Sequence, residues 1–216
     1  MTLSQKVVLA FCRPLFSILF SWKVEGRENI PLNGPLILIT NHVNLFDPFF
    51  LIFSFPRWIN FMAKEELFRS PFLRFWLRWA GAVSINREGK VREKQKILKS
   101  AREALEMGLI VGMFPEGGRS YDGKLRKGKP GSAVIASKTD TPLLPVGIIG
   151  TDKIKGTSWL WKRPRIVVNI GKPFKLSSTS GRMTRSQMQL LTTQMMREIA
   201  ALLPPEYQGD YEKHEN

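Results

Sequence analysis

The stretch NHVNLFDP, residues 41–48, holds one of only two histidines in the chain, His42, followed by Asp47 in an H-x-x-x-x-D spacing. On a continuous helix this spacing would turn the two side chains about 140° apart, whereas a strand followed by a turn can bring them together. The carboxylate would then fix the imidazole tautomer and leave the other ring nitrogen to act as a general base. The spacing alone favours a structural role, in which Asp47 caps the next helix and His42 fills the turn.

A second polar stretch, FPEGGRS at residues 114–120, combines a carboxylate, two glycines and an arginine. The glycines allow backbone amides to approach a ligand closely, and the planar guanidinium of Arg119 suits a phosphate. A tight polar turn in which Glu116 and Arg119 form a local ion pair is the alternative. Arg87, which ends GAVSINR, is either a second phosphate contact or an ordinary solvated charge, and alone it favours the latter.

The loop GKLRKGK, residues 123–129, matches the first seven positions of the P-loop pattern G-x-x-x-x-G-K-[ST]. Pro130 replaces the Ser or Thr whose hydroxyl would hold magnesium, and no strand is predicted immediately before the loop. We therefore reject a nucleotide-triphosphate site and assign Lys127 to a basic, phosphate-facing loop. A serine hydrolase is disfavoured too, because the chain contains no G-x-S-x-G.

The segment RSPFLRFWLRWAG, residues 69–81, predicts a helix that starts at Ser70 and Pro71. Its two arginines, Arg74 and Arg78, project to one side. The opposite face is aromatic and consists of Phe72, Phe75, Trp76 and Trp79. Such a face suits a membrane interface or the wall of an acyl-chain channel, and suits packing on the core equally well.

Strands and helices are predicted to alternate along the chain. Short apolar runs predict strands at 34–40, 58–63, 81–86, 109–114, 143–149 and 165–171. Helices are predicted at 91–108 and 131–138, and from the capping box of Thr184 and Gln187 to about Leu203; Asp47 and Pro48 predict a further helix start, with Asp47 as N-cap. This order indicates an α/β layered domain with a mostly parallel central sheet flanked by helices.

Three polar segments follow predicted strands, at 41–47, 86–90 and 115–123. Ligands of open α/β sheets bind beyond the carboxyl ends of the strands, so we expect these segments to share one site.

The N-terminal apolar run at residues 7–20 is too short to span a bilayer as a helix of about 20 residues, and Arg13-Pro14 interrupts it. No A-x-A-like cleavage site follows it. A core or docking helix is one interpretation; we favour a kinked, amphipathic helix on a membrane surface. We predict that residues 1–30 form this membrane-docking segment and that residues 31–216 form one α/β domain.

The composition predicts anionic partners. The chain has 33 Lys and Arg against 18 Asp and Glu, a formal net charge of +15. Its 14 Phe and 6 Trp suit contact with an apolar phase and its anionic rim. We expect no nucleic-acid partner, since the basic residues are dispersed and no RNP-like, KH-like or zinc-finger pattern occurs. The single cysteine, Cys12, excludes an intramolecular disulfide and fits a reducing, cytosol-facing location.

Four stretches in order, NHVNLFD, GAVSINR, FPEGGRS and LLPVGI, resemble the sequence blocks of the glycerolipid acyltransferases related to 1-acyl-sn-glycerol-3-phosphate acyltransferase. The resemblance spans roughly Pro35 to Gly150. Four blocks in the same order are far more specific than any one block. They therefore favour a catalytic role for His42, although the spacing to Asp47 alone favours a structural one. Two positions depart from the pattern: Asn44 stands where many members have Ser, and Gly118 where the commonest form has Thr.

The resemblance implies roles at the matching positions. His42 is similar to the general base that takes the proton from the free hydroxyl of a lysophospholipid, and Asp47 to the residue that orients its ring. The hydroxyl attacks an acyl thioester, with no acyl-enzyme. Four residues match positions that in the family bind or position the glycerol-phosphate acceptor: Arg87, Glu116, Gly117 and Arg119. Lys127 matches a basic turn that follows the third block in many members.

The resemblance therefore implies transfer of a fatty acyl chain from acyl-CoA or acyl carrier protein to the sn-2 hydroxyl of lysophosphatidic acid, giving phosphatidic acid in phospholipid biosynthesis. It implies no metal or cofactor, and an anionic membrane surface at the cytoplasmic face. Gly118 and Asn44 motivate an alternative acceptor, such as another lyso-lipid or glycerol-3-phosphate. The charge of +15 motivates a different class, a basic membrane- or nucleic-acid-binding protein without turnover.

Overall fold

Seven strands form one sheet in the order β1-β7-β6-β2-β5-β3-β4. The computed structural model describes residues 2–85, 91–177, 181 and 183–212. The strands are β1 Ser21–Glu25, β2 Leu36–Thr40, β3 Ile59–Lys64, β4 Val83–Ile85, β5 Ile110–Met113, β6 Leu143–Ile149 and β7 Arg165–Ile170. Only the β6–β7 pairing is antiparallel among the strand pairs of the described residues. The predicted α/β class with a mostly parallel sheet is confirmed.

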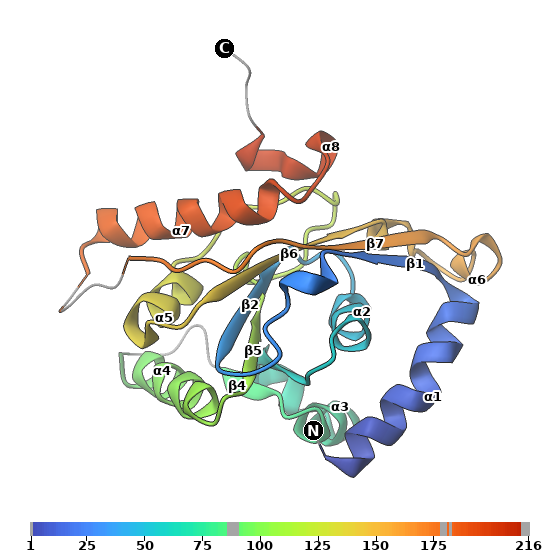
Figure 1. Cartoon of the computed structure of the whole chain (residues 1–216), viewed down its shortest axis with the longest axis horizontal. Coiled ribbons are helices and arrows are strands. Elements are labelled where there is room, and N and C mark those ends of the chain that lie inside the picture. Colours follow the sequence, from blue (N-terminus) through green and yellow to red (C-terminus); the bar gives the residue numbers. More distant parts are fainter. Residues whose placement is uncertain (1, 86–90, 178–180, 182, 213–216) are drawn as a thin grey trace.

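Helices cover both faces of the sheet (Figure 1). They are α1 Leu3–Leu19, α2 Asp47–Ser54, α3 Pro71–Trp79, α4 Val91–Glu106, α5 Gly131–Thr139, α6 Trp159–Lys162, α7 Arg185–Ala200 and α8 Pro205–Gln208. One hydrophobic core lies between the sheet and α4, α5 and α7, and a second lies between the sheet and α1 and α2. The last predicted helix ends at Ala200, and the short α8 after it was not predicted.

The central strand β2 is buried along its whole length. Ile37 and Ile39 belong to one core, while Leu36 and Leu38 belong to the other, as the two-residue period of a strand requires. A parallel strand covered on both faces reads as a continuous apolar run, which is why LILIT is recognisable in the sequence.

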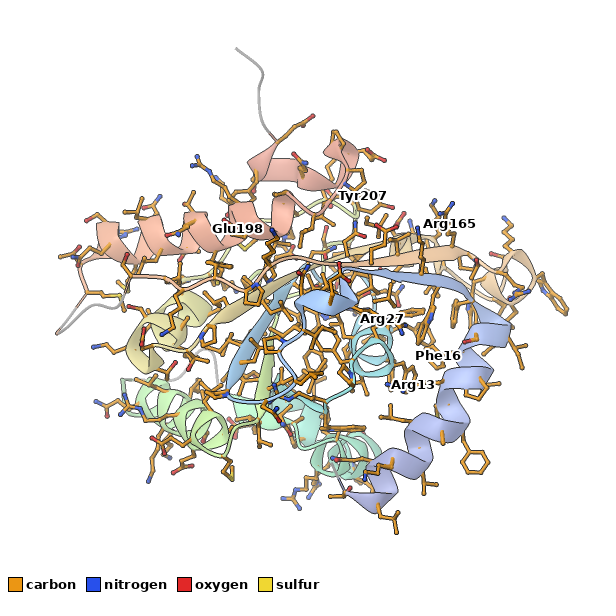
Figure 2. All side chains as sticks on the ribbon, in the orientation of Figure 1. Arg13, Phe16, Arg27, Arg165, Glu198 and Tyr207 are labelled. Carbon is orange, nitrogen blue, oxygen red and sulfur yellow. The ribbon has the colours of Figure 1, made fainter. Side chains whose placement is uncertain are left out.

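The N-terminal segment contributes both a helix and an edge strand. Strand β1 lies within residues 1–30, the predicted docking segment, and pairs in parallel with β7. Helix α1 runs from Leu3 to Leu19 with Pro14 inside it. Figure 2 shows Arg13 and Phe16 directed from α1 toward α2; the guanidinium of Arg13 donates to the Phe55 carbonyl (2.7 Å), and the Phe16 and Phe53 ring centroids are 4.6 Å apart. In the described part of the chain, no helix is both long enough and apolar enough to cross a membrane.

Candidate active site

The turn after β2 is fixed to β6 and to the segment that follows it. The side-chain amide of Asn41 donates to the carbonyl of Ile148 and its oxygen accepts from the amide of the same residue, both at 2.8 Å. The side chain of Asn44 donates to the carbonyls of Thr151 and Ile154, both at 3.1 Å. Asn44, one of the two departures from the family pattern, therefore serves to hold the turn in place.

His42 and Asp47 lie together across this turn. The His42 Nδ1 atom is 2.8 Å from Asp47 Oδ2, and this oxygen also accepts from the backbone amides of Val43 and Asn44, each at 2.7 Å. Asp47 is completely buried, whereas the His42 side chain is 16% exposed. A carboxylate can only accept hydrogen bonds, so in the neutral imidazole the proton is assigned to Nδ1 and the lone pair to Nε2. This tautomer is the one that a general base requires.

The predicted N-cap role of Asp47 is wrong. Helix α2 begins at Asp47 itself, the N-cap position belongs to Phe46, and no side chain caps that end of the helix. The reason is that Oδ2 accepts the amides of the preceding turn instead of those of the helix. The same oxygen therefore closes the turn and orients the imidazole.

An aromatic stack holds the His42 ring from one side. The His42 and Phe114 ring centroids are 4.0 Å apart with an interplanar angle of 22°, and Phe61 also stacks on Phe114, at a centroid distance of 5.4 Å and an angle of 12°. Phe114 was not among the predicted site residues. Its position directly after β5, the neighbour of β2, is the signal that could have found it.

Glu116 joins the His42 turn to a third loop. It is 3% exposed; its Oε1 accepts from the backbone amide of His42 (2.8 Å) and its Oε2 from that of Arg126 (3.0 Å). Burial raises the pKa of Glu116 to about 7, although the two amide hydrogen bonds oppose this shift. Both oxygens contact the backbone, so the carboxylate holds together the loops that carry His42 and Arg126.

The raised pKa of Glu116 predicts a pH-dependent contribution to stability. The folded state binds this proton more tightly than the unfolded state, whose carboxyl has a pKa of 4.5, so the contribution is complete below pH 4.5 and is lost as pH rises through 7. Relative to the Glu116→Gln variant, the parent should lose about 3 kcal/mol of unfolding free energy between those limits. Urea unfolding of both proteins across this pH range measures the difference; parallel profiles would contradict the assignment.

The loop from Glu116 to Ser120 is hydrogen-bonded to the His42 backbone at both ends. Glu116 Oε1 accepts from the His42 amide, and the Ser120 amide donates to the His42 carbonyl (2.7 Å). Gly117 has φ +72°, a backbone conformation that favours glycine; a Cβ atom there would lie 2.7 Å from Cδ of the Lys129 side chain, which would have to move aside. Arg119 is half-buried, and its carbonyl accepts from the guanidinium of Arg126 (3.2 Å). The structure thus brings together His42, Asp47, Glu116, Gly117 and Arg119.

The remaining predicted residues lie elsewhere or outside the described part. Lys127 is exposed and lines a cavity of about 1000 Å³ together with residues of α7 and the segment that follows it. Arg87 falls in residues 86–90, outside the described residues. Phe75 is exposed on α3. Phe72, Trp76 and Trp79 also lie on α3, but their side chains are outside the described part.

Comparison with known proteins identifies the family. A family model described as Acyltransferase matches residues 21–149, more than half of the chain. The crystal structure of the 1-acyl-sn-glycerophosphate (LPA) acyltransferase PlsC from Thermotoga maritima is similar, with a TM-score of 0.65 and 29% identity, over 88% of this chain and 75% of that one.

Two relatives are named 1-acyl-sn-glycerol-3-phosphate acyltransferase. The protein of Borreliella burgdorferi is 35% identical over 60% of this chain and 51% of its own length. The protein of Bacillus subtilis is 26% identical over 89% of this chain and 95% of its own length. The chain spans about half the length, or less, of several curated relatives that it matches. Because the family model covers most of the sheet, including β2 and β5 with the loops that follow them, the chain belongs to the acyltransferase family.

Proposed function

We propose that the chain transfers a fatty acyl group from an acyl thioester, acyl-CoA or acyl carrier protein, to the sn-2 hydroxyl of lysophosphatidic acid and so forms phosphatidic acid. One observation above all supports this function: the 2.8 Å contact between His42 Nδ1 and Asp47 Oδ2, which leaves Nε2 as the basic nitrogen. The family and the names of the relatives supply the reaction class in which such a base would act.

In the proposed step, Nε2 of His42 takes the proton of the acceptor hydroxyl while the hydroxyl oxygen attacks the thioester carbonyl carbon. A carbon–oxygen bond forms, the carbon–sulfur bond breaks, and the departing thiolate receives the proton back from the imidazolium. Asp47 stabilises the imidazolium through Oδ2. Phe114 lies against the imidazole face at 4.0 Å, a position in which an aromatic ring attracts a cation. This step draws on no metal or cofactor.

Cationic side chains are proposed to bind the acceptor phosphate. Arg119 belongs to the loop that is hydrogen-bonded to His42 at both ends, and its guanidinium offers the planar geometry that a phosphate accepts. Arg87 and Lys127 are proposed as further phosphate contacts on the basis of the family resemblance. Glu116 and Gly117 would shape this site through the backbone contacts described above.

We propose that α1 rests on an anionic membrane surface at the cytoplasmic face, where the lysophospholipid acceptor resides. Five large apolar side chains on α1 are exposed at a helical spacing: Leu3, Val7, Phe11, Leu15 and Ile18. The formal charge of +15 would favour the same surface. The exposed Phe75 on α3 is a candidate for a further membrane or acyl-chain contact, together with its predicted partners Phe72, Trp76 and Trp79.

Product analysis tests the function directly. Detergent-solubilised protein is incubated with lysophosphatidic acid and a mixture of acyl-CoA chain lengths, and in parallel with acyl carrier protein thioesters, and the products are identified by mass. The expected result is phosphatidic acid with one acyl chain added. Absence of product from every donor and acceptor, together with RNA or DNA binding that falls steeply with salt, would favour the basic binding protein.

A second acceptor is favoured by the space beside Gly118. A Cβ atom built at Gly118 meets no atom within 4 Å among the described residues, so the loop leaves room for a larger headgroup. Gly118 also lacks a positive φ, so a larger residue should fit without backbone strain. This candidate is another lyso-lipid processed by the same chemistry.

The Gly118→Thr variant should therefore fold normally and discriminate against larger headgroups. We expect the ratio of kcat/KM for a larger-headgroup lyso-lipid to that for lysophosphatidic acid to fall about tenfold, because a difference of one or two carbons in the space open to a substrate is worth about that much. An acceptor panel with a single donor measures the ratio for both proteins. Identical ratios would assign no acceptor selectivity to this position.

A further inference from the structure

Helix α6 is a second site of exposed apolar surface, separate in sequence from α1. Trp161 is 85% exposed, the largest exposed fraction among the large apolar side chains of the described residues, and its neighbour Leu160 is also exposed. Moving an exposed indole ring out of water is favourable, and exposed apolar side chains that adjoin one another are a mark of interaction sites.

Two contacts fasten α6 to the C-terminal end of α1. Trp159 stacks on Phe20 with centroids 5.0 Å apart and an interplanar angle of 8°, and the guanidinium of Arg163 donates to the carbonyl of Ser17 (3.1 Å). Figure 1 shows α6 near the C-terminal end of α1, at the right-hand edge of the view. The exposed Ile18 lies next to Ser17 in this last turn of α1. The apolar surface of α1 therefore continues toward α6.

The charged side chains of the segment that contains α6, residues 151–165, are almost all positive. Five basic side chains between residues 151 and 165 are exposed: Lys153, Lys155, Lys162, Arg163 and Arg165, the last labelled in Figure 2. The single acidic residue of this segment, Asp152, accepts a hydrogen bond from the Tyr207 hydroxyl (2.7 Å). Tryptophan beside lysine and arginine is the composition of a lipid interface, where each basic group near an anionic surface contributes about 1 kcal/mol.

The same segment is joined to the candidate active site. Asn44, in the His42 turn, donates to the carbonyls of Thr151 and Ile154. Phe46, at the start of α2, contacts Trp159 with a centroid distance of 5.7 Å. A partner that binds α6 would therefore lie close to the turn that carries His42.

We propose that residues 153–165 form a second lipid-binding element which, together with α1, makes one docking surface for a bilayer with anionic headgroups, with Trp161 entering the interface. The lipid bilayer is the partner that matches both features of this segment, an exposed tryptophan and exposed basic side chains close to it in the chain. The inference rests on the proposed function only in that the acceptor of that reaction resides in the membrane.

Vesicle co-sedimentation of the full chain tests the docking surface. Vesicles of phosphatidylcholine containing phosphatidylglycerol should bind the parent, and the Trp161→Ser variant should partition about tenfold more weakly, which corresponds to about 1.4 kcal/mol of lost burial. The matched control is Leu190→Ser, because Leu190 is 69% exposed on α7, which packs against the other face of the sheet. This control should bind like the parent. Pure phosphatidylcholine vesicles should bind the parent more weakly than the mixed ones.

The binding assay needs no turnover, so its outcome is separate from that of the acyl-transfer assay. Parental binding by Trp161→Ser overturns the role of α6, whether or not the enzyme is active. Equal losses in Trp161→Ser and Leu190→Ser overturn it as well, because the effect would then be unspecific. A dimer that forms without vesicles and requires Trp161, with vesicle binding unchanged by the substitution, would assign this surface to a second copy of the chain and not to lipid.

Discussion

Replacing His42 with alanine is expected to lower kcat/KM for acyl transfer by about 10²- to 10⁴-fold, the usual contribution of a general base. The substitution removes Nε2, the nitrogen that takes the hydroxyl proton. It leaves the turn in place, because Asp47 Oδ2 still accepts the amides of Val43 and Asn44 and Glu116 still accepts the backbone amide of residue 42. Steady-state rates with lysophosphatidic acid and one acyl-CoA measure the loss.

The chain offers its own control for this experiment. His214 is the only other histidine, in the polar C-terminal tail, and His214→Ala should retain the parental rate. Urea unfolding of His42→Ala separates lost chemistry from lost folding. A folded His42→Ala variant that transfers acyl chains at the parental rate would remove His42 from the mechanism.

Local sequence patterns were sufficient for elements whose signal repeats within a few residues. The run LILIT predicted β2, and the capping box of Thr184 and Gln187 predicted the start of α7, which the structure confirms. Strand β1, residues 21–25, was missed because SWKVE alternates exposed and partly buried residues and lacks the continuous apolar run of LILIT. It lies at the edge of the sheet, where a strand is less buried than a central one and carries a weaker apolar signal.

The site was predictable in its location and less so in its hydrogen bonds. The alternation of strands and helices placed His42 and Glu116 at the carboxyl edge of a parallel sheet, and the structure joins them because β2 and β5 are neighbours. The pairing of Asp47 with His42 was predicted, but the backbone partners of Asp47 and Glu116 were not predictable. Both carboxylates accept backbone amides, and which amides approach depends on the path of each loop.

Asp47→Asn is expected to lower kcat/KM by on the order of 100-fold or more, because the variant keeps the shape of the side chain and removes the charge that stabilises the imidazolium. It should also cost about 1–3 kcal/mol of unfolding free energy. The reason is that Oδ1 of Asp47 is buried without a hydrogen-bond partner among the described residues, so an amide nitrogen there would leave its donors unsatisfied. Kinetics and urea unfolding measure the two effects separately.

The double variant His42→Ala with Asp47→Asn distinguishes an orienting role from a purely structural one. If Asp47 acts through His42, the double variant should be no slower than His42→Ala alone, since the orienting carboxylate has no ring left to orient. A structural defect at Asp47 would instead multiply the two losses, because a distorted turn would also impair acceptor binding by the neighbouring Arg119 loop, which is hydrogen-bonded to residue 42. If the losses of kcat/KM multiply in the double variant, Asp47 only shapes the turn. If the double variant is as active as His42→Ala, the two residues act as one catalytic unit.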